Sequence, residues 1–557
     1  MRDNTHALWY IGGMSLTLAA LLTANSEQLL KLTKRRHPEY ADTIEHWDFM
    51  ESCYKGGRSW IEKNLFTYHK EGHKEFAERK KRAYRFPHSR EVISLINKYV
   101  FKGSIERKEE LPAHIKEFWG AATIMKKPIA DFMDSVSLWT SALGRIWVVV
   151  DNNVPAGVRS EADRKQSGGR TYAYFLKPMQ VYDFAYDTDG ELEWFLNGEF
   201  KRDDQNPLTS SGKTNEQFRL WTKEFWAVIE VTGDKNDKRA RVASSGRHNL
   251  GMVPVFPADH LSTDELYKAP GLIEDVAYMD RAVTNYLSNL DVIIQDQTYS
   301  QLAIPFQGLL PTAGNDDDDE ASEELNQIQQ MGHNRVFAYN AEGGAGPEFL
   351  SPDVKQASMI ISTVTKIVGE IYHSIGMAGE RTKEDNAAGI DNSSGVAKAY
   401  DFEKLNAMLA AKARALQNVE HNLIRLVNAW NGEKKELEET DLPVTYPQTF
   451  DVRNLADEMD NAQRLSVMNA PKKLRQAQMT RLAKKMFPQA TEEEINAIVK
   501  DIEDEWLKED PLALMPKDGP PQLGGGRVPG KKNSQGENNK GTVKADDKAK
   551  AEKDDEK

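Results

Sequence analysis

The sequence predicts an α+β protein that is mainly α-helical. Apolar residues recur every three or four positions through residues 271–295, 352–375 and 394–430, which is the spacing of amphipathic helices. Aromatic and β-branched residues alternate in much of the segment 146–262, as they do in half-buried strands. Residues 511–557 are dominated by Gly, Pro and charged side chains, so we expect a disordered tail there.

Length and charge limit the classes of function. A chain of 557 residues can form roughly two to four regions that each bury a core. The formal net charge of −13 argues against a protein that grips nucleic acid over a wide surface, because such binding needs Lys and Arg to neutralise phosphates. It leaves room for a protein that lets DNA pass without holding it. The single cysteine, Cys53, excludes an intrachain disulfide and a cysteine-type zinc site, and it fits a reducing compartment.

The N-terminus contains the only long apolar run, residues 7–23. It could be the apolar part of a signal peptide, a buried terminal helix, or an extension from a misassigned start codon. Because it is shorter than the roughly 20 residues of a membrane-spanning helix, we treat residues 1–24 as an apolar N-terminal extension and expect no membrane span. Residues 25–145 are predicted to be helical, and the basic run Arg79–Arg82 is expected to be a solvated helix face.

Residues 146–262 are predicted to form a small, mostly antiparallel β region. The run 146–150, Ile-Trp-Val-Val-Val, has the composition of a buried strand. Thr188-Asp-Gly190 has the residues of a tight turn and lies between the aromatic-rich runs 182–186 and 192–196. This arrangement predicts a β-hairpin.

Two helices of similar length flank an insert. The first is predicted within residues 263–304 and the second within 351–378, where Ser351 is a suitable N-cap and Gly376 a suitable stop. The insert, 305–350, has short apolar pieces separated by glycine and acidic residues. We expect it to form a small subdomain at the far end of the two helices.

A polar segment, 379–393, separates the second helix from a third, which is predicted over residues 394–432. This third helix would be ~50 Å long, well beyond the length of an ordinary globular helix. Residues 442–510 continue with shorter amphipathic helices, one of which starts at the capping-box sequence Thr491-Glu-Glu-Glu494.

The search for catalytic motifs is negative, so we predict no enzymatic activity, no cofactor and no metal site. Ser210-Ser-Gly-Lys-Thr214 resembles the end of a phosphate-binding loop, but Pro207 stands where the motif needs its first Gly. His69 and His73 could share a helix face, yet no third ligand follows at metal spacing. The run Asp316–Asp319 lacks the spacing and the Gly of an EF-hand loop, and a solvated acidic loop is expected instead.

The order of these parts resembles the portal proteins, or head-to-tail connectors, of tailed bacteriophages. The resemblance covers about residues 25–510. It is carried by short segments in a fixed order: Tyr54-Lys-Gly-Gly57, Lys177-Pro-Met-Gln-Val-Tyr-Asp183, Asp189-Gly-Glu-Leu-Glu-Trp194, Gly271-Leu-Ile-Glu-Asp-Val-Ala-Tyr-Met-Asp280, Leu302-Ala-Ile-Pro305 and Ser393-Ser-Gly-Val-Ala-Lys-Ala-Tyr-Asp-Phe402. An insert between two helices, followed by a polar loop before a very long helix, makes that order specific.

The resemblance implies a portal-like fold and assigns each part a role. The N-terminal helical segment 25–145 and the β region 146–262 would form the wing. The other parts would be the stem (263–304 and 351–378), the clip (305–350), the tunnel loop (379–393), the long wing helix (394–432) and the crown (442–510). The implied function is a ring at one capsid vertex, of twelve copies in the virion, around an axial channel for DNA.

The resemblance also implies partners and site residues. The clip would contact the terminase large subunit during packaging, and head-completion or adaptor proteins afterwards, through Asp316, Asp317, Asp318, Asp319 and Glu320. The tunnel loop would face double-stranded DNA, which passes non-specifically, with Glu380, Arg381, Lys383, Glu384, Asp385 and Asp391. The ring would contact the major capsid or scaffolding protein, assemble in the host cytoplasm, and stay in the virion as the exit conduit for DNA.

Three alternatives remain open. A non-enzymatic helical adaptor or scaffold of another assembly would share this composition, and it would be exported if residues 7–23 are a signal. A packaging ATPase would need an intact phosphate-binding loop, which the sequence lacks. The charged residues of 379–393 could also be a solvated loop between helices that faces no channel.

Overall fold

The computed structural model describes residues 16–506 with internal gaps. The gaps are 69–70, 104, 109, 155–166, 203, 205, 234–236, 249, 299–300, 306–336, 340–347, 351–353, 377–394, 434–442, 449, 451–462, 466–467, 469–470 and 488–491. Residues up to Asp451 form one unit and residues from Val452 form a second.

The N-terminal part of the first unit is helical, as the sequence predicts. Its helices are α1 (Leu18–Thr23), α2 (Ser26–Thr33), α3 (Pro38–Lys55), α4 (Arg58–Asn64), α5 (His73–Arg82), α6 (His88–Val100), α7 (Ala113–Gly120) and α8 (Ile129–Leu143). The apolar run at the start of the chain belongs to the fold from Leu18 onward, because Leu21 and Leu29 are buried with the apolar face of a β-sheet. Residues 1–15 lie outside the described part of the chain.

Two antiparallel sheets make up the β region. The central sheet has the order β3–β2–β9, formed by Thr171–Leu176, Arg145–Asn152 and Val255–Asp259. The second is a meander of β4 (Val181–Tyr186), β5 (Leu192–Arg202), β6 (Thr214–Thr222), β7 (Phe225–Thr232) and β8 (Arg239–Arg247). The predicted hairpin is confirmed as β4 and β5, and Gly190 in its turn has φ +80°, a conformation that glycine adopts without strain.

The central sheet forms one core with the helices around it. Trp147 on β2 is fully buried, and its indole N–H donates to the hydroxyl of Tyr40 on α3 at 2.9 Å. Apolar residues of α3, α6, α8 and the long helix α14 (Gly395–Trp430) share this core. Two short strands, β1 (Glu106–Arg107) and β13 (Val444–Thr445), pair antiparallel beside α14.

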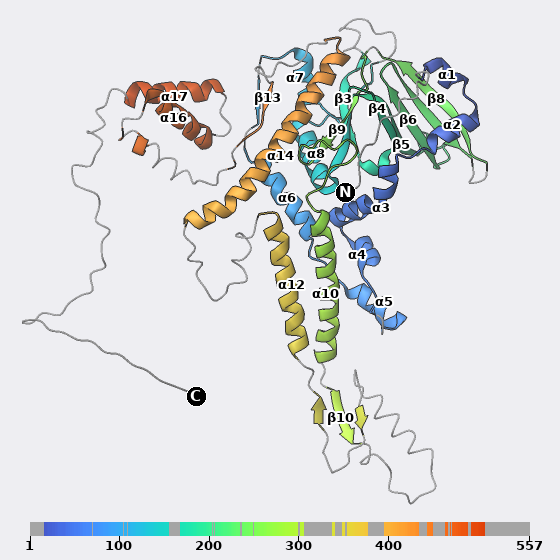
Figure 1. Ribbon diagram of the computed structural model, residues 1–557, viewed down its shortest axis with the longest axis vertical. Helices are drawn as coiled ribbons and strands as arrows, with labels where there is room; N and C mark the ends of the chain where they lie inside the picture. Colours follow the sequence, from blue (N-terminus) through green and yellow to red (C-terminus); the bar gives the residue numbers. More distant parts are fainter. Residues whose placement is uncertain are drawn as a thin grey trace, which may run out of the picture. The chain divides into compact units, whose positions relative to one another are not determined.

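Three long helices follow the β region, and they match the sequence prediction closely. They are α10 (Glu274–Thr298), α12 (Val354–Ser374) and α14. The strands β10 (Gln301–Pro305), β11 (Phe337–Tyr339) and β12 (Glu348–Leu350) lie between α10 and α12 in the chain. Figure 1 shows α10 and α12 extending side by side from the body, with the β10 sheet at their far end.

The second unit contains α16 (Lys472–Met486) and α17 (Glu492–Trp506). Ala483, Ile495 and Val499 are buried between these two helices. Helix α17 begins next to the predicted capping box, whose first residue, Thr491, lies in a gap.

These elements establish a mixed α+β fold.

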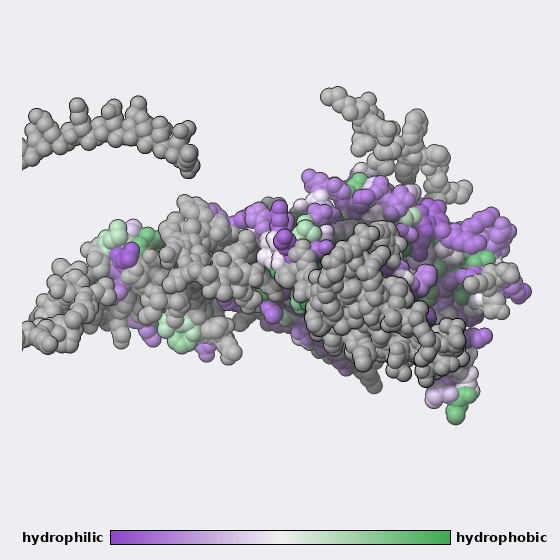
Figure 2. Space-filling view, turned by 90° about the horizontal axis from the view of Figure 1, so that it is seen from below, coloured by the Kyte–Doolittle hydropathy of each residue, from purple (hydrophilic) through white to green (hydrophobic). Residues whose placement is uncertain are grey.

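In the face that Figure 2 shows, the described residues are mostly hydrophilic, and hydrophobic residues occur in small groups. None of the helices in the described ranges combines the length and the hydropathy that crossing a membrane requires.

Candidate assembly site on the paired helices

The clearest functional feature is the pair formed by α10 and α12. At ~1.5 Å per residue, 25 and 21 residues give helices of about 37 and 32 Å. Their strands form a three-stranded sheet in the order β11–β10–β12. Ala303 at its centre faces Phe337 in the parallel neighbour and Glu348 in the antiparallel one. This sheet lies where the sequence predicts a small subdomain, at the far end of the helices, but it begins at Gln301 and so before the predicted start at residue 305 (Figure 1).

The body end of α10 is fixed by a buried ion pair. The carboxylate of Asp280 is fully buried and accepts hydrogen bonds from Arg85 Nη2 at 2.5 Å, Ser89 Oγ at 2.6 Å and Ser89 N at 3.0 Å. The guanidinium of Arg85 also lies 4.0 Å from the ring centroid of Trp60. A carboxylate with this many donors is held in one place, so the position of α10 on the N-terminal helices is well defined.

A second arginine fixes α10 farther along. Arg79 is buried, donates to Glu71 Oε1 and Oε2 at 2.7 and 2.6 Å, and reaches Ser288 Oγ at 3.1 Å. The interpretation of Arg79–Arg82 as a solvated helix face is therefore wrong for Arg79. Paired with Glu71 and hydrogen-bonded to α10, its charge can be buried at this contact.

The body end of α12 is fixed by the main core. Ile371, Tyr372 and Ile375 are buried there, and the hydroxyl of Tyr372 donates to Glu91 Oε2 at 2.7 Å. One end of the helix pair is thus held firmly by the body, and the remaining length projects from it.

The outer length of the pair exposes large apolar side chains. Met359 and Ile361 on α12 are 65% and 53% exposed, and Ile294 on α10 is 52% exposed. Ile361 belongs to the apolar stripe that predicts this helix, whereas Ile371 of the same stripe is buried. A single copy therefore covers only the body end of the stripe. Met359 and Ile361 are two positions apart, so they lie on different sides of α12, and the outer part of this helix exposes apolar groups on more than one side.

The opposite flank of α10 also exposes an aromatic residue. The segment before α5 lies against α10, since Phe66 N donates to Asn285 Oδ1 at 2.9 Å. The ring of Phe66 is 54% exposed and lies 5.2 Å from the guanidinium of Arg281. In Figure 1, α10 lies between α12 on one side and α5 on the other. The helix pair therefore has exposed apolar groups on two different flanks.

The residues that the resemblance assigns to the clip and the tunnel loop lie outside the described part of the chain. This applies to Asp316, Asp317, Asp318, Asp319 and Glu320, and to Glu380, Arg381, Lys383, Glu384, Asp385 and Asp391. Their roles remain predictions.

The structure also brings together polar groups that the sequence analysis missed. Glu420 on α14 is fully buried and accepts from Arg107 Nε at 2.7 Å and from the hydroxyl of Tyr446 at 2.9 Å. This contact attaches β1 and the segment after β13 to α14. Within the described ranges, no group of three or more His, Cys, Asp or Glu residues is placed to hold a metal ion.

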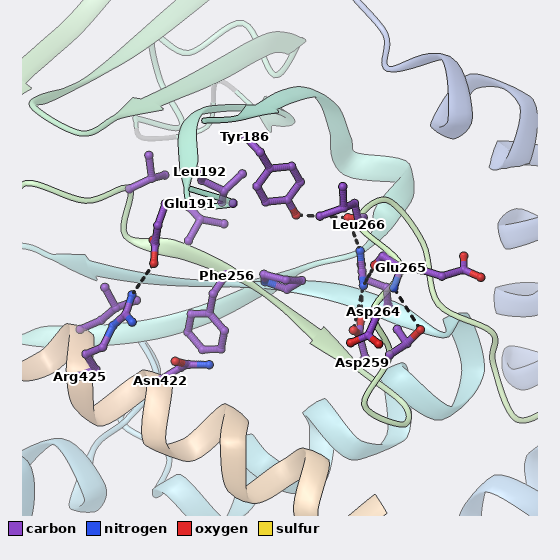
Figure 3. A pocket seen from close by; sticks show the side chains of 17 residues that line it. Tyr186, Glu191, Leu192, Phe256, Asp259, Asp264, Glu265, Leu266, Asn422 and Arg425 are labelled. Atoms are coloured by element: carbon purple, nitrogen blue, oxygen red, sulfur yellow. Dashed lines mark hydrogen bonds and ion pairs between the residues drawn. The ribbon is translucent and has the colours of Figure 1, made fainter. Parts of the chain in front are cut away.

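A polar cavity of about 420 Å³ lies where the β4–β5 turn, the end of β9 and α14 meet (Figure 3). Two pairs of opposite charges lie in its wall. Arg145 contacts both oxygens of Asp259 at 2.6 and 2.9 Å and two backbone carbonyls of the adjoining loop, and Arg425 lies 3.9 Å from Glu191. These contacts join the elements around the cavity to one another, so we interpret them as structural contacts.

Comparison with models of known protein families gives no match. No curated protein matches the sequence either. Among solved structures, a chain from the neck of an empty gene transfer agent particle, computed with C6 symmetry, has a TM-score of 0.37 at 10% identity, covering 68% of this chain and 86% of that one.

Two further matches are of the same kind. A chain of the virion of a native gene transfer agent particle has a TM-score of 0.34 at 11% identity, over 69% of this chain and 90% of that one. A chain of the native particle's neck, computed with C12 symmetry, has a TM-score of 0.35 at 10% identity, over 71% and 89%. Scores of this size do not establish a shared fold.

Proposed function

We propose that this chain is a portal protein of a tailed bacteriophage, a head-to-tail connector. In this proposal, copies form a ring at one capsid vertex around a channel through which double-stranded DNA is packaged and later leaves. The observation that carries the proposal is the helix pair α10–α12, which projects from the body and leaves large apolar side chains uncovered in a single copy.

The free energy of burying apolar side chains favours a second copy of the chain as the partner that covers these exposed residues. Fully burying a side chain such as Met359 or Ile361 contributes about 1.5–3 kcal/mol relative to leaving it in water. These residues and Ile294 are more than half exposed, and each lies farther from the body end of its helix than the buried contacts of Arg79 on α10 and of Ile371 on α12. Contacts with a second copy would recover that free energy for every copy in an assembly.

The position of the exposed groups favours a ring over a two-fold dimer. Met359 is exposed on α12, whereas Phe66 is exposed on the segment that lies against the other helix, α10, at Asn285. When one flank of a copy contacts the other flank of the next, the contact is heterologous, and it repeats until the assembly closes. These two flanks of each copy are sufficient to close a ring, without a third contact surface.

We assign roles to the clip and to the tunnel loop from their positions in the chain. The clip acids Asp316–Asp319 and Glu320 belong to the chain segment between β10 and β11, and we assign them the contact with the terminase and later with head-completion proteins. We assign the charged residues of 379–393, which precede α14, to the channel wall. Mixed charge there suits DNA that must pass without strong phosphate contacts. The proposal assigns no catalytic step to the chain.

The test is the assembly state of the purified protein. Native mass spectrometry and negative-stain class averages should show a closed ring of about a dozen copies with a central hole. Met359→Glu and Ile361→Glu should dissociate it, because each places a charge in the contact. Leu208→Glu is the matched control, since Leu208 is 93% exposed on the loop between β5 and β6 and should leave the ring intact. A wild-type monomer or dimer would overturn the proposal and favour the helical adaptor.

The channel assignment has its own test. Glu380, Glu384 and Asp385 are changed together to their amides in a phage assembly system, and the length and retention of packaged DNA are measured. We expect altered packaging or retention, because the charge facing the DNA changes. Unchanged packaging and retention would defeat the assignment of residues 379–393 to the channel. An ATPase assay on the purified chain should show no turnover.

A further inference from the structure

A lysine is buried in the middle of the long helix α14. Lys412 has no exposed surface, and its ammonium nitrogen has three polar neighbours. Nζ lies 2.6 Å from Thr140 Oγ1 and 3.1 Å from the carbonyl oxygen of Ser137, both on α8, and 3.0 Å from Nδ1 of His260, the residue after β9. One side chain therefore connects α14 to α8 and to the end of the central sheet.

The hydrogen-bond donors and acceptors around Lys412 Nζ determine how many protons the site can accommodate. The hydroxyl hydrogen of Thr140 is used on the backbone of its own helix, at 2.9 Å from the carbonyl of Val136 or 3.0 Å from that of Ser137, so its oxygen accepts from Lys412. Two hydrogens of the amine thus go to α8. One position remains, between Nζ and Nδ1 of His260, and it holds a single proton.

That single proton can sit on either partner. An ammonium on Lys412 can donate to a neutral imidazole, or the Nδ1–H of His260 can donate to a neutral amine. When both groups are protonated, two N–H bonds point at each other across 3.0 Å, and both charges are buried. The contact must then open.

The surroundings offer little to offset a second charge. The acid beside the pair is Asp259 on β9, and its carboxylate is already held by Arg145 of β2 at 2.6 and 2.9 Å. Helix α8 presents the neutral groups of Ser137, Thr140 and Ser141, the last with its oxygen 3.3 Å from Nδ1 of His260.

Burial also acts directly on the two bases. It lowers the pKa of Lys412 well below its usual value, against the attraction of Asp259. It lowers the pKa of His260 well below its usual value as well, and the charge of Lys412 adds to that effect. Both effects agree with the hydrogen count.

We propose that Lys412 and His260 form a proton-linked latch, which holds the middle of α14 against α8 and β9 with one shared proton and opens when a second proton binds. The latch is a property of the body and does not depend on the assembly of copies. Because α14 begins directly after residues 377–394 and leads to β13, opening the latch would loosen the element that joins these two segments.

The sign of the pH dependence follows from linkage. Unfolded Lys412 and His260 bind protons at their ordinary pKa values, whereas the folded pair resists a second proton. Stability rises with pH wherever the unfolded state binds more protons. The His260 contribution is therefore fully present above pH ~6.5 and is lost as the pH falls below that value. For one linked proton, the protection of the α14 amides should fall about tenfold per pH unit in that range.

The experiment is hydrogen exchange of residues 405–419 and thermal unfolding at pH 5.5 and 7.5, on the full chain. Lys412→Met keeps an unbranched side chain of similar length and leaves the hydroxyls of α8 bonded to their own helix. We expect it to unfold at a higher temperature than the wild type and to weaken the pH dependence of α14 protection, of which buried His260 keeps a part. Lys404→Met is the matched control, because Lys404 is exposed on the same helix, and it should behave as the wild type does.

A second variant keeps the proposal testable if Lys412→Met does not fold. His260→Gln removes the titrating partner and retains an oxygen that can accept from Lys412, so it should keep α14 protected at pH 5.5 to the level seen at pH 7.5. The proposal is overturned if both variants that fold show the wild-type pH dependence. It is also overturned if the wild-type protection of residues 405–419 is the same at both pH values.

Discussion

Replacing Asp280 with alanine should loosen α10 from the body. The carboxylate is fully buried, and its removal leaves Arg85 as a buried charge without its counter-ion, while Ser89 loses the acceptor for both its backbone N–H and its hydroxyl. Breaking a buried ion pair from one side typically costs about 3–5 kcal/mol. We expect a loss of this size in the free energy that holds α10 in place.

The same helix offers a matched control. Asp291 lies 3.3 Å from Arg82, and these side chains are 26% and 39% exposed. An ion pair that is this accessible to solvent contributes about 0–1 kcal/mol. Asp291→Ala should therefore cost less than about 1 kcal/mol. The double variant Asp280→Ala with Arg85→Met should recover part of the loss, because no unpaired buried charge remains.

Hydrogen exchange of residues 276–290 measures this directly, because the ratio of exchange rates in variant and wild type gives the change in opening free energy. A change of 3–5 kcal/mol corresponds to a factor of at least about one hundred in that ratio. The reasoning is refuted if Asp280→Ala and Asp291→Ala change the exchange by the same factor. It is also refuted if the double variant is less stable than Asp280→Ala.

Three other changes test separate parts of the body. Gly144→Ala should destabilise the end of α8 by several kcal/mol or prevent folding, since Gly144 has φ +80° and a Cβ would lie 1.8 Å from the carbonyl oxygen of Ala269; soluble yield and the unfolding temperature check this. Glu420→Gln should lower the unfolding temperature by an amount equivalent to about 3 kcal/mol, because Arg107 loses its charged partner; a shift equal to that of an exposed Glu→Gln variant would contradict the expectation. Burial raises the pKa of Cys53 to about 11, so its thiol should resist alkylation at pH 8 in the folded protein and react in urea; equal rates in both states would show that the site opens readily.

Much of the fold was predictable from periodicity and turn residues. The stripe through Val276 and Val283 predicted α10, and the turn at Gly190 predicted the hairpin of β4 and β5. Both signals come from residues close together in the sequence, and in both cases the structure that forms is the one these residues favour. The residues that fix these elements to one another were much harder to predict.

The sequence analysis did not predict the buried contacts of Lys412 and Asp280. Both residues are charged, and each lies on the apolar face of its helix. Lys412 falls on the α14 stripe between Leu409 and Leu416, and Asp280 lies one turn after Val276 on α10. A charged residue at such a position is a usable signal of a buried polar contact. Its partners are distant in sequence, as Ser137 is from Lys412, and no spacing rule identifies them.

The pairing of β1 with β13 has a consequence for synthesis. Arg107 lies opposite Val444; α14 packs beside β13 and binds β1 through the ion pair of Glu420 with Arg107. The early strand leaves the ribosome long before its partner exists, so its edge and the adjoining apolar surface stay open through most of translation. Chaperones that shield nascent chains should bind this protein early, and truncations that end before residue 444 should aggregate even though they retain α14 and the two larger sheets.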